Sequence, residues 1–174
     1  RGREGRLMSA VLRSDEPAPL RLEPMRPADP DAVLAVEDAV YAFPWTRGNF
    51  VDSLVAGYDA QLLRSADGAV CAYSLAMHGV QELHLLNLTV APSWQHRGLA
   101  RRLLDALAAS GCAHGAHSLW LEVRESNARA RSVYERYGFV DVGRRPGYYP
   151  AAGGQREHAC VMRLALAPAP VEGD

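Results

Sequence analysis

Apolar residues recur along the chain with two periods, and each period predicts one kind of element. Alternation of apolar and polar residues predicts strands, and apolar residues that return every three to four positions predict helices. The order that results is β-α-α-β-β-β-α-β-α-β-β. The strands are expected at about residues 20–25, 60–64, 69–77, 82–90, 118–123, 139–144 and 157–166, and the helices at about 30–40, 46–55, 99–111 and 126–138. This order predicts the α/β class (mixed α+β), with a central mixed sheet and helices on both of its faces.

Short polar residues and glycines mark where these elements begin and end. Asp29, Thr46 and Ser126 precede helical segments and are the predicted N-caps. Gly138 is predicted to end the last helix, because glycine readily takes the left-handed conformation found there. The pair Asp67-Gly68 between two strands predicts a hairpin turn.

The predicted strand at 82–90 changes its pattern half-way along. Leu83 and Leu85 share one face, whereas Leu86 and Leu88 have the opposite parity. A strand that keeps one face toward a core changes parity only through an extra residue, so we expect a β-bulge at Leu85–Leu86. The alternative is a central strand buried on both faces, in which parity carries little information.

Length and composition predict one globular domain. The chain has 174 residues, of which 48% are hydrophobic and 22% are charged, as in ordinary soluble domains. We assign residues 20–166 to the domain, 1–19 to an N-terminal extension that is disordered or a cloning remnant, and 167–174 to a disordered tail. No apolar stretch approaches the roughly 18 residues of a membrane span, and no secretory signal is recognisable. We therefore expect a cytoplasmic protein.

Charge and cysteine content narrow the range of partners and ligands. The net charge is −1, whereas nucleic-acid binding generally needs a strongly basic face. The three cysteines are scattered, so we expect reduced thiols and no metal site. We therefore expect neither nucleic acid nor membrane as a partner, and a monomer or weak dimer.

The segment before the helix at 99–111 has the features of an anion site. Gly98 and Ala100 are small enough to let a ligand approach the backbone, and amide groups at a helix start lack partners and carry partial positive charge. Arginines beside them can add charge-assisted contacts. The alternative is an ordinary tight connection, since such a turn alone is a weak signal. The candidate residues are Gln95, His96, Arg97, Gly98, Leu99, Ala100 and Arg101.

Two motifs follow two of the predicted strands. They are Gln95-x-x-Gly98-x-Ala100 after Leu88-Thr89-Val90-Ala91-Pro92, and the helical segment from Asn127 to Phe139 that contains Tyr134. The first resembles the acetyl-CoA signature of the GNAT acetyltransferases, and the second resembles the next motif of that superfamily. Ala100 stands where many relatives have glycine, which puts cofactor affinity in doubt only if that residue needs a positive φ.

Three further segments sharpen this resemblance. They are Ala42-Phe43-Pro44-Trp45, Leu119-Trp120-Leu121-Glu122-Val123-Arg124-x-Ser126-Asn127, and Tyr148-Tyr149-Pro150 in an expected exposed loop. Together with the motifs above they resemble the RimI-type ribosomal-protein-alanine N-acetyltransferases over about residues 20–166. The resemblance implies a GNAT-like sheet splayed at an acetyl-CoA cleft. It also implies acetyl transfer to a protein's N-terminal α-amine, by direct attack on the thioester.

The acceptor that this resemblance implies is the N-terminal alanine of the eighteenth small-subunit ribosomal protein. One alternative keeps the fold and takes another protein or a small-molecule amine as acceptor. Another alternative is an acyl-CoA-binding protein without activity. The presence of both Glu122 and Tyr134 argues against that alternative, because a pure binding protein needs neither.

By the same resemblance, Glu122 is the general base and Tyr134 the general acid that protonates the leaving sulfur. A carboxylate near its reference pKa of about 4.3 is a weak base, so burial or relay through water is the expected help. The alternatives are a solvent-facing Glu122 paired with Arg124, and a Tyr134 that is plain core. Asn127 and the backbone of Leu88, Thr89 and Val90 are expected to hold the coenzyme A arm, in a slot that the bulge helps to open.

Two aromatic segments and one carboxylate are candidates for binding the acceptor. The aromatic segments can clamp a peptide end, or can be lids on the core. An α-amine, with a pKa of about 7.7–8.0, is roughly 3.4 kcal/mol easier to deprotonate than lysine, so a weak base suits it. The candidates are Phe43, Pro44, Trp45, Tyr148 and Tyr149, with Glu37 to attract a cationic group.

Overall fold

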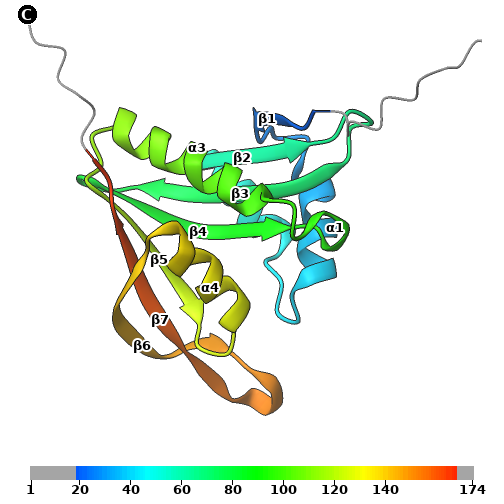
Figure 1. The fold of residues 1–174 in the computed structure, drawn as a ribbon. Coiled ribbons are helices and arrows are strands. Elements are labelled where there is room, and N and C mark those ends of the chain that lie inside the picture. Colours follow the sequence, from blue (N-terminus) through cyan, green and yellow to red (C-terminus); the bar gives the residue numbers. More distant parts are fainter. Residues whose placement is uncertain (1–18, 168–174) are drawn as a thin grey trace, which may run out of the picture.

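The computed structural model describes residues 19–167, which form a mixed sheet with helices on both faces (Figure 1). The expectations for residues 1–18 and 168–174 lie outside this range. The predicted order of elements is confirmed, with two short 3-10 turns added. The strands are β1 (Arg21–Pro24), β2 (Asp59–Arg64), β3 (Val70–His78), β4 (Glu82–Val90), β5 (Ser118–Arg124), β6 (Val140–Pro150) and β7 (Arg156–Ala165). The helices are α1 (Pro30–Val40), α2 (Arg47–Val55), α3 (Leu99–Ala113) and α4 (Ala128–Tyr137).

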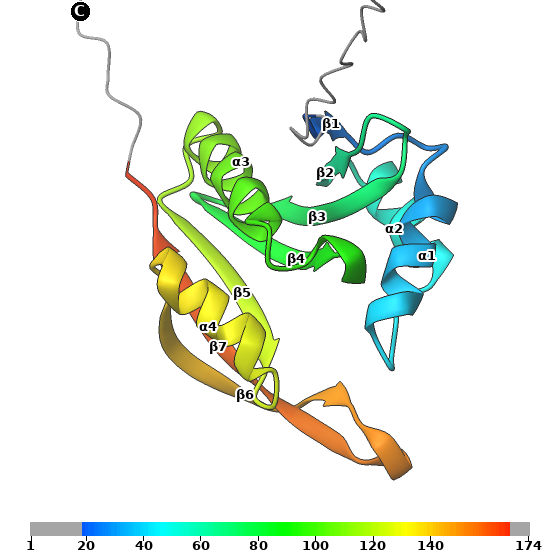
Figure 2. The same ribbon diagram turned by 45° about the vertical axis from the view of Figure 1, so that its right-hand side comes forward.

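The sheet splits into two halves between β4 and β5. In the described residues the strand order is β1-β2-β3-β4-β5-β7-β6. The β4–β5 pair is parallel and joins Glu82–Leu85 to Ser118–Leu121, and no pairing of the two strands follows Leu85. Figure 2 shows β4 and β5 diverging beyond this point, with α3 and α4 on the same side of the sheet. The splayed sheet implied by the resemblance is therefore present.

The predicted bulge in β4 is confirmed. Leu75 of β3 pairs with Asn87 and the next residue, Ala76, pairs with Leu85, so Leu86 is the extra residue. Before the bulge, Leu85 packs in the core beneath α3 and α4. After it, Asn87 turns to the opposite face, where it bonds a buried group of α1. The alternative, in which parity is uninformative, is thereby excluded.

Of the three predicted N-caps, Thr46 and Asp29 lie at the N-cap positions of α2 and α1, whereas Ser126 is wrong. Thr46 forms a reciprocal capping box with Asn49, as its position predicts. Asp29 makes no side-chain cap, because its carboxylate accepts the Arg26 N–H and an Arg64 guanidinium N–H instead. Asn127, not Ser126, caps α4 by accepting the Ala130 N–H at 3.1 Å.

The predicted loop around Tyr148 and Tyr149 is wrong, because these residues lie within β6. Tyr149 pairs with Glu157 of β7, after an irregular stretch that begins at Arg145. Gly147 lies in that stretch with a φ of 58°, a conformation that favours glycine. The strand therefore continues past the irregularity and includes both tyrosines.

Among the described residues, no helix is both long enough and apolar enough to cross a membrane.

Candidate active site

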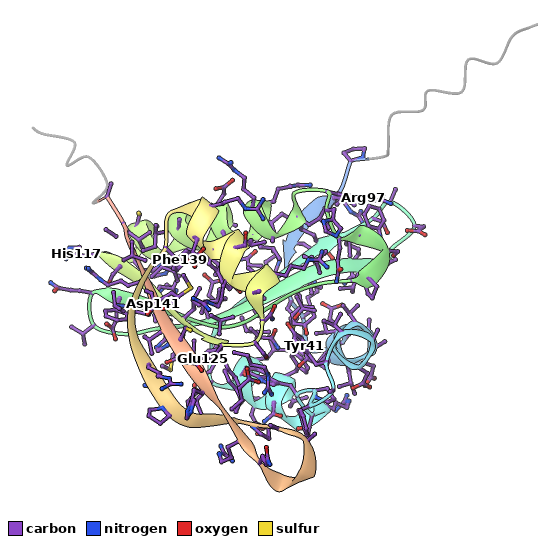
Figure 3. The ribbon with its side chains drawn as sticks, turned by 60° about the horizontal axis from the view of Figure 1, so that its bottom comes forward. Tyr41, Arg97, His117, Glu125, Phe139 and Asp141 are labelled. Atoms are coloured by element: carbon purple, nitrogen blue, oxygen red, sulfur yellow. The ribbon has the colours of Figure 1, made fainter. Side chains whose placement is uncertain are left out.

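Two cavities meet at the split in the sheet. The first cavity, of about 860 Å³, lies between the end of β4, the start of α3 and one side of α4. The second cavity, of about 750 Å³, lies between β5, the end of β6 and the segment after α1. Figure 3 shows Tyr41 beside α1, and Arg97 on the segment that precedes α3. The residues that line both cavities are Val40, Tyr41, Leu88, Asn127, Ala130 and Tyr134.

The start of α3 presents free backbone amides to the first cavity. Gly98 has a φ of 78° and no side chain caps the helix. The Arg102 N–H donates to the Gly98 carbonyl, so the amides that precede it have no intrahelical acceptor. Such a helix start attracts anions. Ala100 lies in the helix without a positive φ, so its replacement of glycine introduces no backbone strain.

A network of side chains holds the segment that precedes α3. Gln95 donates to the Val90 carbonyl at 3.2 Å and accepts from Arg129 at 2.8 Å. Arg129 also lies 2.9 Å from His96, which has a positive φ of 62°. Arg129 and Arg136 line the first cavity and were absent from the sequence-based candidates. The signal that could have found them is their helical spacing, which puts both on the α4 face that carries Val133.

All but one of the residues predicted to bind the cofactor line the first cavity. Arg97 lies outside the lining of the first cavity, with its guanidinium 4.9 Å from the centre of the Trp94 ring. The sequence-predicted residues that do line the first cavity are Leu88, Thr89, Val90, Gln95, His96, Gly98, Leu99, Ala100, Arg101 and Asn127.

Tyr134 lies at the junction of the two cavities. Its ring is buried in the core and packs edge-on against Phe139. Its hydroxyl has no hydrogen-bond partner in residues 19–167, although Tyr134 lines both cavities. Burial, together with the nearby Tyr41 and Tyr149, raises the pKa of Tyr134 well above its ordinary value. The side chain is therefore core and cavity wall at once, and it keeps its proton at every pH of interest.

Glu122 lines the second cavity and contacts two basic side chains. Its Oε2 lies 3.0 Å from His84 Nε2, and its Oε1 lies 3.4 Å from Arg145 Nε. Burial alone raises the pKa of Glu122, but the hydrogen bond and charge of a protonated His84, together with the charge of Arg145, outweigh it and lower the pKa. Burial therefore acts in the expected direction, but the two partners outweigh it; relay through water stays a prediction. The alternative of a solvent-facing Glu122 paired with Arg124 is wrong, because only 8% of its side chain is exposed.

The fold that carries this site is similar to that of known acetyltransferases. Residues 23–139 match the acetyltransferase (GNAT) family. The chain belongs to the GNAT acetyltransferase family. The members of this family take their acetyl group from acetyl-CoA, so the protein is an acetyl-CoA-dependent N-acetyltransferase.

Individual GNAT relatives are similar over most of the chain. The ribosomal protein bS18-alanine N-acetyltransferase of Haemophilus ducreyi is 35% identical over 138 residues, which cover 79% of this chain and 94% of the relative. The protein of the same name from Escherichia coli strain K12 is 36% identical over 139 residues, covering 79% and 92%. The crystal structure of the Escherichia coli ribosomal-protein-S18-alanine N-acetyltransferase has a TM-score of 0.79 at 32% identity, over 90% of this chain and 99% of that one. The resemblance inferred from the sequence is therefore confirmed.

Some of the residues predicted to clamp the acceptor line the second cavity of this acetyltransferase, and others do not. Phe43, Trp45 and Tyr149 line it, whereas Pro44 and Tyr148 do not. The Arg124 guanidinium lies 5.7 Å from the centre of the Phe43 ring and 4.5 Å from that of Tyr149. This arginine was not a sequence-based candidate. It connects the segment after α1 with the end of β6.

Glu37 is 2% exposed, and its carboxylate is saturated by internal donors. Its Oε1 accepts the Trp45 N–H at 2.8 Å. Its Oε2 accepts the Tyr73 hydroxyl and, at 3.1 Å, the Asn87 amide. Because these bonds join α1 to β3, to β4 and to the wall of the second cavity, Glu37 positions that wall. Its expected role in attracting a cationic acceptor stays a prediction.

Replacing Glu37 with alanine is expected to lower the free energy of unfolding of the acetyltransferase by about 3 kcal/mol, because several buried donors lose their acceptor. The measurement is urea denaturation at equilibrium. Asp38→Ala is the matched control: Asp38 is the next residue of α1 and is exposed, so its effect is expected within about 0.5 kcal/mol. Equal effects of the two substitutions would contradict the positioning role.

Proposed function

We propose that this acetyltransferase transfers the acetyl group of acetyl-CoA to the N-terminal α-amine of a protein, namely the alanine of ribosomal protein bS18. The observation that carries the proposal is the meeting of two cavities at Tyr134, with Glu122 in the second of them. This arrangement suits one reactant in each cavity. The relatives named for bS18-alanine acetylation support the choice of acceptor.

The first cavity fits acetyl-CoA by its chemistry. The uncapped start of α3 suits the diphosphate, and Arg101, Arg129 and Arg136 offer positive charge to the phosphates. Pairing of β4 with β5 ends at Leu85, so β5 does not pair with Leu88–Val90, and the amide groups of the pantetheine arm can pair with the backbone there.

Two side chains manage the protons of the reaction. Bound acetyl-CoA supplies a thioester carbonyl for the amine to attack. Glu122 takes a proton from the attacking amine, which must be neutral to act as a nucleophile. Tyr134 retains its proton because burial raises its pKa, so it can donate that proton to the departing sulfur.

The second cavity suits an extended peptide end. Phe43, Trp45 and Tyr149 supply apolar walls, and an α-amine needs less help to lose its proton than lysine does. Pro44 and Tyr148 complete the proposed acceptor segments from outside the lining. A cytoplasmic location and a monomeric or weakly dimeric state stay predictions from the sequence.

The deciding experiment offers acetyl-CoA and three acceptors to the purified protein. They are a peptide that copies the start of bS18, the same peptide with its α-amine blocked and a lysine retained, and a panel of small amines. Intact-mass analysis is expected to show one added acetyl group on the first peptide and none on the second. Acetylation only of lysine or of small amines would refute the proposed acceptor.

A further inference from the structure

His84 contacts Glu122, the proposed base, from outside the second cavity, in which the acceptor is proposed to bind. Its Nε2 lies 3.0 Å from Glu122 Oε2. Glu122 lines the second cavity, whereas His84 lies outside that lining. His84 is on β4 one position before the last residue that pairs with β5, and its side chain is 25% exposed. The imidazole therefore connects the buried carboxylate to solvent.

Glu122 by itself is poorly matched to its proposed task. The carboxyl group of a glutamate has an ordinary pKa of about 4.3, whereas an N-terminal ammonium group has a pKa of about 7.7–8.0. A proton placed on this carboxylate therefore returns to the amine far more readily than it stays. The site needs a stronger proton acceptor within reach of Glu122.

The geometry points to His84 as that acceptor, and we propose that the proton leaving the amine passes through Glu122 and ends on the His84 ring. This inference rests on the proposed function. The amine loses one N–H proton and keeps the electron pair. The carboxyl group passes a proton across the 3.0 Å contact to Nε2 and is again an anion. His84 becomes an imidazolium ion and later releases its proton to solvent, and nothing is oxidised or reduced.

The relay requires a neutral His84 whose ring hydrogen is on Nδ1, so that Nε2 can accept. Because Glu122 and His84 interact, their apparent pKa values belong to the pair. The first proton that the pair binds lies on the more basic imidazole and is held more tightly than a proton on Glu122 alone. The pKa of His84 is raised, first by its hydrogen bond to Glu122 and further by the charges of Glu122 and Glu82, while burial and Arg145 oppose this. The neighbours opposite His84, namely Met77 of β3 and Trp120 of β5, carry no charge.

The first test compares the pH profiles of kcat/KM for His84→Gln and wild type, with the bS18-type peptide as acceptor. Glutamine can still donate to Glu122 but cannot take a proton. The variant is expected to be about 10- to 100-fold slower at pH 7 and within about threefold of wild type at pH 9, where the amine is already largely neutral. His117→Gln, an exposed histidine outside both cavities, is the control and is expected to follow wild type.

An equal loss at pH 7 and pH 9 would overturn the relay, because a purely structural role lowers the rate at every pH. If wild type does not acetylate the peptide, a small amine that it does acetylate replaces the peptide in the same comparison. Failure to acetylate the peptide then counts against the proposed acceptor, and the pH comparison with the small amine still tests the relay.

The second test needs no turnover. NMR titration of the His84 ring is expected to give a pKa above that of ordinary histidine in wild type and one near about 6.5 in Glu122→Gln. An unchanged value in Glu122→Gln would refute the coupling, and with it the relay.

Discussion

Replacing Glu122 with glutamine is expected to lower kcat/KM for the peptide acceptor about 10²- to 10³-fold. Glutamine has the size of glutamate and keeps one oxygen toward the cavity, but it cannot take a proton from the amine. Glu122 lines the second cavity and not the first, so the dissociation constant of acetyl-CoA is expected to stay within about twofold. Steady-state kinetics and isothermal titration calorimetry measure the two effects separately.

The matched control for Glu122 is Glu125→Gln. Glu125 lies just beyond the end of β5, outside both cavities, where it pairs with Arg144 at the surface (Figure 3). Loss of an exposed ion pair of this kind is worth at most about 1 kcal/mol of stability and leaves the reaction untouched. A Glu122→Gln enzyme with near-normal turnover would remove this residue from the mechanism.

Replacing Tyr134 with phenylalanine is expected to lower kcat about 10²-fold while the KM for acetyl-CoA changes little. The ring keeps its packing against Phe139, so the fold and the cavity wall survive. What disappears is the hydroxyl that is proposed to protonate the departing sulfur, and that burial keeps protonated before the reaction by raising the pKa of Tyr134. Single-turnover kinetics isolate this loss from product release.

A stability measurement and a control variant accompany the Tyr134 substitution. Thermal stability is expected to stay the same or rise slightly, because the hydroxyl that is removed has no hydrogen-bond partner in residues 19–167. Tyr58→Phe, at a tyrosine that lines neither cavity, serves as the control for kcat. If Tyr134→Phe turns over like wild type, the leaving group is protonated by another donor.

The order of elements could be read from the sequence because it depends on local periodicity. The parity change in β4 even revealed the bulge, since an extra residue leaves a visible trace in the alternation of leucines. Helix caps could not be assigned in the same way. Asp29 has a suitable side chain at a suitable position, yet a long-range partner, Arg64, occupies it.

The strand nature of Tyr148 and Tyr149 was equally hidden. Their local sequence of glycine, tyrosine and proline is typical of a turn, and only pairing with β7 turns the segment into the end of β6. Arg129 and Arg136 share a face of α4 with Val133 by their spacing, but only the packing of α4 against the sheet shows that this face lines the first cavity.

The sequence by itself determined the fold, the family and many of the residues that gather around the two cavities, because motifs and periodicity are local properties. It also predicted an anion site in the turn before α3. Only the tertiary structure decided how the site is charged. His84 and Glu122 are 38 positions apart, and Arg145 approaches from β6, so their effect on the carboxylate depends on strands that meet only in the folded sheet. Electrostatic coupling depends on distance and burial, and neither is encoded in the spacing of residues along the chain.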